Sequence, residues 1–570
     1  MAISASPDYT CLRAGAPGTG DNPDTPGSWD VVFRDGRTFR WEGFYTGPRV
    51  LSPDRLREIC RQLLGIDLDD VPAAAASGLR PYVSDGTPTP SIILHSATPV
   101  LKSVEADLSD AMNGRVADDV ATYVEARAVS LAGPGDVVVG RTHPWAVAAR
   151  LAGVEAVAIP GIDFYYLSHA ILDLAANGGE DPAPLRRLVR VLTDRPHTLI
   201  RLYALDREIQ MVLLYLKRQA GLDFLLTDAN SPEVADYWNT KAPLHPLATE
   251  AARLTVGDDP EKTLRDEICI SPIARKLHIE CPVLPGYTVG DPDRAGADIG
   301  DEIRLAARLL ADRYGLTRGC FKPSEGGAGA RIVRDVRLGD DAALDRLAEA
   351  ARRTGGQYIL EPQFSYLTAT VSGTTFTLAP SGHVRYGHVA DGLTLQFTNG
   401  TSWQGNLYFD AAACHEVGVG PAEYAAITTM LRELYAAFTE NGHSLVTAGF
   451  DFAVGTVGGA FGGRLFTVMQ DPNLSSHGAE YLRLFLDTVR DGRRTAYAAT
   501  KVVIPRAPLG VLRERQVAED PRRFRVLTAI PGRWGMIAAS GPSPRAAMEE
   551  LGSREKELLN AGLVVEAPPR

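Results

Sequence analysis

Residues 319–330 place a lysine at the entrance to a loop of small residues, between two short apolar runs. Cys320-Phe321 leads into Lys322, and Ile332-Val333 follows the loop. Small residues let a backbone approach a ligand closely and turn its N–H groups toward an anion, and a lysine adds a point charge. The segment therefore predicts a strand–loop–strand unit that can hold a polyphosphate. A plain β-hairpin turn fits the same spacing equally well, and the Gly-Lys-Ser/Thr of a P-loop is absent.

The bulk composition limits the classes of protein to which the chain can belong. A chain of 570 residues is too long for one ordinary core, so several domains are expected. The net charge of −11 argues against a nucleic-acid partner, which would need a basic face. Without a secretory signal or an apolar run of membrane-spanning length, we expect a cytoplasmic protein with no membrane partner. The six cysteines lack a C-x-x-C pair, which favours reduced thiols over a zinc site.

The order of the expected elements predicts an α/β (α+β) protein with five regions. Residues 1–28 are expected to be a flexible lead-in, and residues 29–130 an accessory region with a hairpin across Asp35-Gly36. Alternating strands and helices over 131–235 predict a small parallel βαβ domain. Residues 236–495 combine helices at 301–314, 342–352 and 421–441 with strands and turns, one of them at Ser381-Gly382. Residues 496–570 are expected to form a small C-terminal α+β domain.

Three further signals follow Lys322 in a fixed order. An apolar strand ends at Glu361, where backbone groups can contact an adenine edge. Asp451 lies within an apolar strand, where a charged side chain is costly unless it is paired or bound to a metal. Asp471 and Asn473 are two residues apart, so they share one face of an extended chain. Two carboxylates and an amide oxygen suit Mg²⁺ that carries substrate phosphates. A strand-end acid without such a role would explain Asp451 alone, but it does not explain the ordered set.

This order resembles the ATP-grasp superfamily, to which carboxylate–amine ligases such as D-alanine–D-alanine ligase belong. The resemblance covers roughly residues 235–495 and includes Lys241, which matches an earlier phosphate-binding lysine of the family. It implies an ATP-grasp fold that follows the parallel βαβ domain, with ATP and Mg²⁺ as cofactors. The residues it assigns to the nucleotide are Lys241, Lys322, Ser324, Gly326, Gly327, Gly329, Glu361, Gln363 and Phe364. The residues it assigns to the metal are Asp451, Asp471 and Asn473.

The chain departs from the family pattern at three places. Asp471 replaces the usual glutamate, and no ribose-binding glutamate follows the hinge in residues 367–371. Gly449 stands where the D-alanine ligases carry an arginine, so the transferring phosphoryl group needs another cation, for which His477 and Arg464 are candidates. Residues 384–409, with Trp403-Gln404-Gly405-Asn406, look more like the pheganomycin-type peptide ligases.

The resemblance implies an ATP-dependent ligase that joins a small carboxylic acid to an amine through an acylphosphate and releases ADP. Lys322 would act on the phosphates, and His477 could take the proton of the amine. A surface turn with a solvated histidine fits His477 equally well. An ATP-grasp carboxylase or kinase, and a nucleotide-binding protein without ligase activity, stay open as alternatives. Homodimers are common in the family. The sequence does not identify the acid or the amine.

Overall fold

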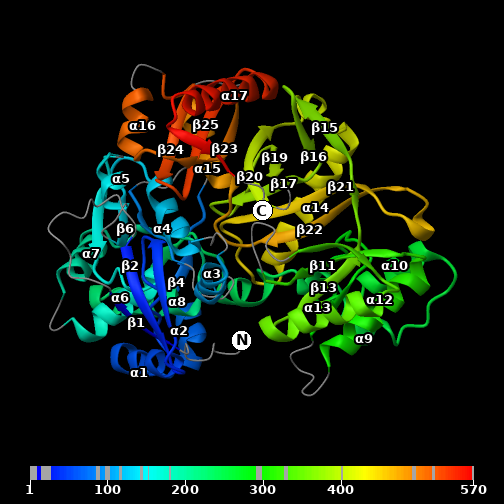
Figure 1. Cartoon of the computed structure of the whole chain (residues 1–570), viewed down its shortest axis with the longest axis horizontal. Helices are drawn as coiled ribbons and strands as arrows, with labels where there is room; N and C mark the ends of the chain where they lie inside the picture. The colour runs from blue at the N-terminus through cyan, green and yellow to red at the C-terminus, as the bar shows by residue number, and fades with distance from the viewer. Residues whose placement is uncertain are drawn as a thin grey trace.

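The computed structural model describes most of the chain. The described ranges are residues 9–13, 27–84, 90–96, 103–114, 119–141, 145–151, 153–178, 182–290, 298–325, 332–399, 402–490, 496–516 and 520–567. The N-terminal part of the chain occupies the left of Figure 1, the middle part the lower right, and the remainder forms the upper part. The α/β (α+β) class predicted from the sequence is confirmed, because one parallel sheet and several antiparallel sheets are all combined with helices.

An antiparallel sheet of three strands begins the described chain. It consists of β1 (Tyr9–Arg13), β2 (Gly27–Phe33) and β3 (Thr38–Phe44), and the predicted hairpin across Asp35-Gly36 joins β2 to β3. The prediction that residues 1–28 are a flexible lead-in is wrong for residues 9–13. These residues pair with β2, and the ring of Tyr9 packs edge-on against Phe33 with the ring centroids 6.0 Å apart. The alternation of apolar side chains in this short strand was hidden by the polar residues that follow it.

A parallel sheet of six strands forms the second layer and confirms the βαβ prediction. Its strands are β4 (Leu79–Pro81), β9 (Leu225–Thr227), β8 (Leu199–Leu202), β5 (Ile92–Leu94), β6 (Val137–Arg141) and β7 (Glu155–Ile159), in that spatial order. The sheet takes in β4 and β5, which lie upstream of the segment in which the sequence suggested alternation. β5 and β8 are neighbours in the sheet but far apart in the chain, so the strand order reverses between them.

Helices surround the parallel sheet, and their apolar faces form its core. The helices of this region are α1 (Pro53–Leu64), α2 (Val71–Gly78), α3 (Ser103–Met112), α4 (Val120–Ser130), α5 (Trp145–Leu151), α6 (Leu167–Asn177), α7 (Ala183–Asp194) and α8 (Arg207–Ala220), with a 3-10 turn at Leu68–Asp70. Helix α8 is buried along most of its length, and its two ends are set by Asp206, which caps the first turn, and by Gly221, in the left-handed conformation.

The next layer is an antiparallel sheet of four strands that carries Lys322. The strands are β10 (Tyr287–Val289), β13 (Tyr358–Pro362), β11 (Arg318–Pro323) and β12 (Val333–Arg337), in that spatial order. Helices α12 (Ile299–Tyr314) and α13 (Asp341–Thr354) pack together beside this sheet. Helix α12 begins earlier than the sequence predicted, because the side chain of Asp298 accepts a hydrogen bond from the N–H of Gly300.

Short elements connect the parallel sheet to the four-stranded sheet. They are a π-helical turn (Val234–Trp238), a 3-10 turn (Ala242–Leu244), α9 (Ala248–Ala251), α10 (Pro260–Ile268) and α11 (Pro272–Leu277).

The largest sheet has eleven strands and carries the predicted metal ligands. Its main path is β14 (Ser365–Tyr366), β21 (Ala448–Thr456), β17 (Pro380–Arg385), β19 (Leu393–Asn399), β20 (Ser402–Phe409), β23 (Tyr497–Pro505), β25 (Trp534–Gly541) and β24 (Phe524–Ile530). Strands β22 (Leu465–Asn473), β18 (His388–Val389) and β26 (Val564–Glu566) pair with β21, β17 and β23. A separate hairpin consists of β15 (Thr368–Val371) and β16 (Thr374–Thr377). The prediction of a turn at Ser381-Gly382 is wrong, because both residues lie inside β17.

The C-terminal strands continue this large sheet rather than forming a sheet of their own. Strand β23 pairs with β20 next to Gly405, whose φ of +148° favours glycine. A Cβ at this position would lie 2.0 Å from the carbonyl oxygen of Thr500, so only a glycine lets the two strands approach. The helices of this half are α14 (Pro421–Glu440), α15 (Ala479–Arg490), α16 (Leu509–Gln516) and α17 (Pro544–Asn560), with 3-10 turns at Cys414–Val417 and Gly459–Phe461.

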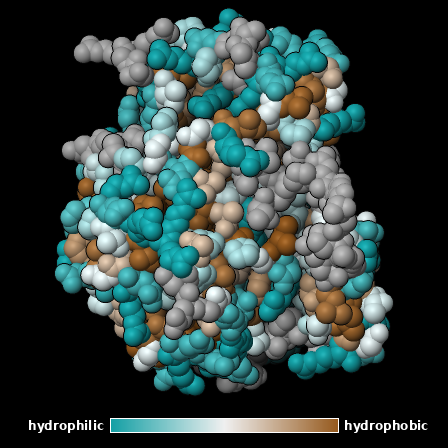
Figure 2. All heavy atoms as spheres, turned by 90° about the vertical axis from the view of Figure 1, so that its left-hand side faces the viewer, coloured by the Kyte–Doolittle hydropathy of each residue, from teal (hydrophilic) through white to brown (hydrophobic). Residues whose placement is uncertain are grey.

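Figure 2 shows the side of the molecule that lies on the left of Figure 1. Hydrophilic side chains predominate on the part of this face that is coloured, and hydrophobic side chains form small separate patches. None of the helices that the structure describes combines the length and the apolar character needed to cross a membrane.

Candidate active site

Two neighbouring rows of residues cross the three strands β17, β21 and β22. In the first row Ser381 pairs with Asp451, and Asp451 pairs with Asp471. In the second row His383 pairs with Gly449, and Gly449 pairs with Asn473. Directly opposed residues on antiparallel strands have side chains close enough to interact. The pairing of the strands therefore brings the three predicted metal ligands together, although Asp471 and Asn473 follow Asp451 by 20 and 22 positions in the chain.

Asp451 is surrounded by hydrogen-bond donors. Its Oδ1 accepts from the Oγ of Ser381 and from the Nε2 of Gln396 at 2.7 Å, and its Oδ2 accepts from the Nδ2 of Asn473 at 3.0 Å. Burial, together with the neighbouring Asp471, raises the pKa of Asp451 to about 6, although the three donors oppose the shift. Two carboxylates this close in a half-buried place repel each other, and a bound cation would relieve that repulsion.

Lys241 supplies a positive charge to this pair of acids. Its Nζ lies 2.9 Å from Oδ2 of Asp471, and only 8% of the residue's surface is exposed. The backbone on both sides of its side chain is anchored to Ser324, whose carbonyl accepts from the N–H of Lys241 and whose Oγ accepts from the N–H of Ala242. Ser324 therefore ties the segment that carries Lys241 to the strand that carries Lys322.

Lys322 contacts Gln470, the residue that precedes Asp471 on β22. Its Nζ is 3.0 Å from Oε2 of Glu361 and donates to the carbonyl oxygen of Gln470 at 3.4 Å. Burial opposes the charge of Lys322, but Glu361, Cys320 and Asp471 together outweigh this effect, and the pKa of Lys322 is raised. Burial and the charge of Lys322 together lower the pKa of the adjacent His245 to about 3, so that imidazole is neutral. The carboxylate of Glu361 thus faces a lysine in this structure.

Two more of the residues predicted to bind the nucleotide, Gln363 and Phe364, contact other residues of the protein. Gln363 accepts a hydrogen bond from the N–H of Asp335 through its Oε1 at 2.9 Å. Phe364 is buried and packs edge-on against Tyr366, whose hydroxyl donates to Oε1 of Gln470 at 2.7 Å. The positions Gly326, Gly327 and Gly329 lie outside the described residues.

His477 covers the position at which the sequence suggested a missing arginine. A Cβ on Gly449 would lie 3.2 Å from Cγ of His477, so the glycine leaves room for the imidazole. The ring stacks on His383 with the centroids 4.6 Å apart and an interplanar angle of 11°. Burial lowers the pKa of His477 to about 4; Glu480 opposes the shift, while Arg127, Arg483 and other guanidinium groups reinforce it. The imidazole is therefore neutral near pH 7 and able to accept a proton.

The structure keeps Arg464 apart from the other candidates. Arg464 follows the turn that joins β21 to β22, at the opposite end of the hairpin from Asp451, and it forms an ion pair with Glu261. Its side chain is half exposed. We therefore set Arg464 aside, and because the imidazole of His477 is neutral it does not supply the missing cation either; His477 is kept only as a candidate proton acceptor.

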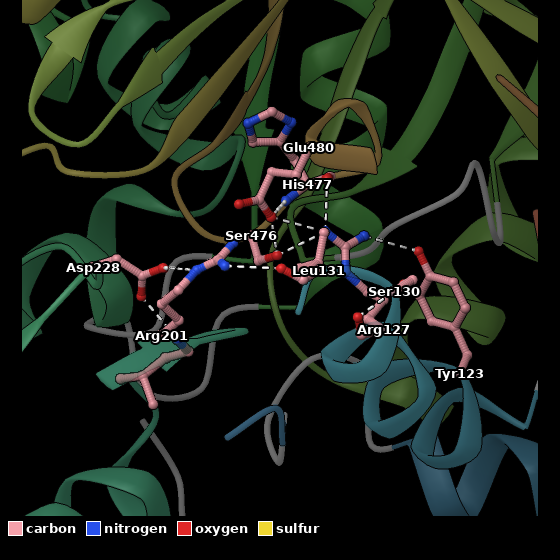
Figure 3. A network of polar contacts seen from close by, with 10 residues as sticks. Tyr123, Arg127, Ser130, Leu131, Arg201, Asp228, Ser476, His477 and Glu480 are labelled. Carbon is pink, nitrogen blue, oxygen red and sulfur yellow. Dashed lines mark hydrogen bonds and ion pairs between the residues drawn. The ribbon is translucent and has the colours of Figure 1, made fainter. Parts of the chain in front are cut away.

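Residues that the sequence analysis missed complete the site. Ser381 was concealed by a turn-like Ser-Gly pair, and Gln396 lies among alternating strand residues that carry no particular signal. Arg127 lies on α4, more than three hundred residues before the acids. Its Nη2 donates to Oγ of Ser476 and to the carbonyl oxygen of His477, both at 2.7 Å, and lies 2.9 Å from Oε2 of Glu480 (Figure 3). No sequence pattern predicts such a contact.

Comparisons with known proteins found partial matches to solved structures but no relative by sequence. No protein-family model and no curated protein matches the chain. Among solved structures, N5-carboxyaminoimidazole ribonucleotide synthetase from Thermus thermophilus is 15% identical with a TM-score of 0.41, over 78% of this chain and 97% of that one. The biotin carboxylase domain of 2-oxoglutarate carboxylase from Hydrogenobacter thermophilus is 13% identical with a TM-score of 0.42, over 76% and 87%. D-alanyl-alanine synthetase A from Vibrio cholerae is 10% identical with a TM-score of 0.30, over 51% and 71%.

The buried pair of Arg127 and Glu480 predicts a stability that depends on pH. Arg127, His477 and Ser476 outweigh burial and lower the pKa of Glu480 from 4.5 to about 2. The folded state therefore gains stability from the ionised form above pH 4.5 and loses it as the pH falls toward 2. We expect Glu480→Gln to lower the free energy of unfolding at pH 7 by about 3 kcal/mol. Urea unfolding at a series of pH values measures this difference.

The matched control is Glu349→Gln, which removes an exposed carboxylate that pairs with Arg353 one helical turn away. It should change the free energy of unfolding by less than about 0.5 kcal/mol. A loss for Glu480→Gln that stays constant between pH 7 and pH 3 would show that the ionised pair does not stabilise the fold.

Proposed function

We propose that this chain is an ATP-dependent ligase of the ATP-grasp type, which joins a small carboxylic acid to an amine and releases ADP and phosphate. One observation carries the proposal. Two buried lysines, Lys241 and Lys322, contact consecutive residues of the strand that also bears Asp471 and Asn473, and Asp451 lies opposite on the paired strand. Charge neutralisation and alignment of a polyphosphate need this combination of groups.

The residues at the acid row fit a magnesium ion. Asp451, Asp471 and Asn473 offer carboxylate and amide oxygens, the ligands that Mg²⁺ prefers, on adjacent strands. Among the described residues no group of three or more His, Cys, Asp and Glu side chains could hold a metal. With two carboxylates and one amide the protein cannot fill six positions, so substrate phosphates and water would complete the shell. The site therefore suits Mg²⁺ that arrives with a nucleotide.

The protein's own side chains would bind the phosphates and accept the proton. When bound, Mg·ATP supplies the phosphoryl group that activates the substrate carboxylate. Lys322 and Lys241 neutralise the phosphates, and both must exchange a carboxylate partner, Glu361 or Asp471, for the nucleotide. His477 is neutral and can take the proton from the attacking amine. No covalent intermediate with the protein is needed.

The division of the chain follows from the same proposal. Residues 236–495 would form the ATP-grasp unit, with the nucleotide between the four-stranded and the eleven-stranded sheets, and residues 131–235 would belong to the preceding domain. A carboxylase or kinase on the same fold would use the same lysines and acids and would differ in its acceptor. A homodimer is compatible with the proposal.

The reaction class can be tested with one assay. With ATP, Mg²⁺, a panel of carboxylic acids and hydroxylamine in place of the amine, the enzyme should release ADP and form a hydroxamate. The reason is that an activated acyl group reacts with hydroxylamine as it would with the natural amine. Formation of AMP and pyrophosphate would contradict the proposal, and ADP without any hydroxamate would favour a kinase.

Removal of the lysine beside the glycine loop should stop the reaction without unfolding the protein. Lys322→Ala deletes a preorganised charge at the phosphates, and the loss of one such group commonly lowers kcat by about 10²–10³. Steady-state ADP release measures the effect. Lys262→Ala is the control, because Lys262 is an exposed lysine that pairs with Asp266 on α10, and it should keep the parent rate. A Lys322→Ala variant with near-normal kcat would exclude a role at the phosphates.

The ion pair of Lys241 and Asp471 predicts that metal and nucleotide bind cooperatively. Without nucleotide, the ammonium of Lys241 competes with a cation for Asp471, so Lys241→Met should tighten the binding of Mn²⁺ alone by about tenfold. The same variant should weaken ATP binding, because a phosphate partner is lost. Electron paramagnetic resonance of free Mn²⁺ and calorimetry of ATP binding measure the two effects. Weaker Mn²⁺ binding by Lys241→Met would contradict the exchange, and Lys262→Met is the control.

A further inference from the structure

The segment from Leu474 to Glu480 follows the predicted metal pair directly, and it is held by residues from far upstream in the chain. The N–H of Leu474 donates to Oδ1 of Asn239 at 2.6 Å, and the carbonyl of Leu474 accepts from Nδ2 of Asn230 at 2.7 Å. The N–H of Ser476 donates to the carbonyl oxygen of Tyr203, at the end of β8, at 2.8 Å. All three anchors belong to the parallel sheet or to the turn that follows it.

Arg127 adds the contacts that define the conformation of this segment. A single nitrogen of its guanidinium group, Nη2, reaches the Oγ of Ser476, the carbonyl oxygen of His477 and Oε2 of Glu480 (Figure 3). The residue is 0% exposed, and its guanidinium carbon lies 4.5 Å from the centroid of the Tyr481 ring. Because a buried cation without a partner is costly, Glu480 and the other acceptors hold Arg127 as firmly as Arg127 holds them.

A role in binding a substrate anion is disfavoured for Arg127. Its charge is balanced by Glu480, and the other buried guanidinium group of Figure 3, on Arg201, lies 3.7 Å from Oδ2 of Asp228. The network therefore has acid partners for both cations. The contacts of Arg127 are directed at a loop rather than at open space.

We propose that Arg127 is a positioning residue. By fixing the segment from Leu474 to Glu480 it sets the place of His477, which lies within the segment, and of Asp471 and Asn473, which directly precede it. This inference rests on the proposed function for its consequence in catalysis. The reason for an arginine is geometric: while Nη2 contacts the segment, Nη1 donates to the hydroxyl of Tyr123 at 3.2 Å and the guanidinium group lies beside the Tyr481 ring. The ammonium of a lysine has no second nitrogen and no planar face to keep these orienting contacts. The parallel sheet, through α4, thus controls the metal site on the eleven-stranded sheet.

The test compares Arg127→Lys with Arg141→Lys. Arg141 is an equally buried arginine, which pairs with Glu125 and with backbone carbonyls near β7 and does not contact the segment. We expect Arg127→Lys to weaken the binding of Mn²⁺ about tenfold in the presence of a non-hydrolysable ATP analogue and to lower kcat for ADP release at least tenfold. The KM for ATP should change little, because Lys241 and Lys322 are untouched. Arg141→Lys should lower the unfolding temperature but leave both quantities at the parent values.

Equal Mn²⁺ affinity in Arg127→Lys and the parent would overturn the inference, whatever the loss of stability. Ser476→Ala serves if Arg127→Lys does not fold, because it removes one acceptor of Arg127 and one donor to Glu480 but leaves both members of the buried ion pair in place. It should weaken Mn²⁺ binding about threefold, and an unchanged affinity would again contradict the inference. Failure of the parent to release ADP would contradict the proposed function alone, because the Mn²⁺ measurement does not depend on turnover.

Discussion

Asp451 and Asp471 lie directly opposite each other on paired strands, and the surrounding residues compensate the repulsion between the two carboxylates. Two carboxylates in a half-buried place are unfavourable, and burial with mutual repulsion raises the pKa of Asp451. Three donors from β17, β19 and β22 surround Asp451, and Lys241 comes from a separate segment to Asp471. Such an arrangement adds little to stability by itself, and under the proposed function it serves to receive a cation and phosphates.

The charges of Lys241 and Lys322 are likewise compensated by neighbouring carboxylates. Each is buried, each has a carboxylate partner, and each contacts a different residue of β22: Lys241 contacts Asp471 and Lys322 contacts Gln470. The partners keep the charges compensated in the structure as it stands. Nucleotide binding would replace carboxylates by phosphates around the lysines and release Asp471 for the metal, so the two ligands would bind together rather than in turn. The charged groups of the site are therefore already buried and in place before the substrate binds.

A polar network joins the parallel sheet to the eleven-stranded sheet, beside a hydrophobic core that contains residues of both. Arg127 and Asn230 hold the loop after Asp471 and Asn473, and Oδ1 of Asn230 accepts a hydrogen bond from the N–H of Val446, just before β21. Buried polar groups need all their partners, so small displacements of one sheet are resisted by the other. A network of this kind transmits position well, because its hydrogen bonds are lost if either sheet shifts by an ångström.

The sequence by itself was sufficient for the α/β class, the parallel βαβ unit, the bounds of α14 to within one residue, and the order of Lys322, Asp451, Asp471 and Asn473, because hydrophobic periodicity and short motifs are local. The strand at residues 9–13 was not predicted, because five residues beside a polar segment give too weak a hydrophobic pattern. Only the tertiary structure decided which distant residues meet. Ser381 and Gln396 reach Asp451, His477 occupies the space above Gly449, and Arg127 binds the loop after the acids through the register of β17, β21 and β22 and the docking of α4. Those contacts depend on strand pairing and on the burial of charged groups across hundreds of residues, and no local pattern encodes them.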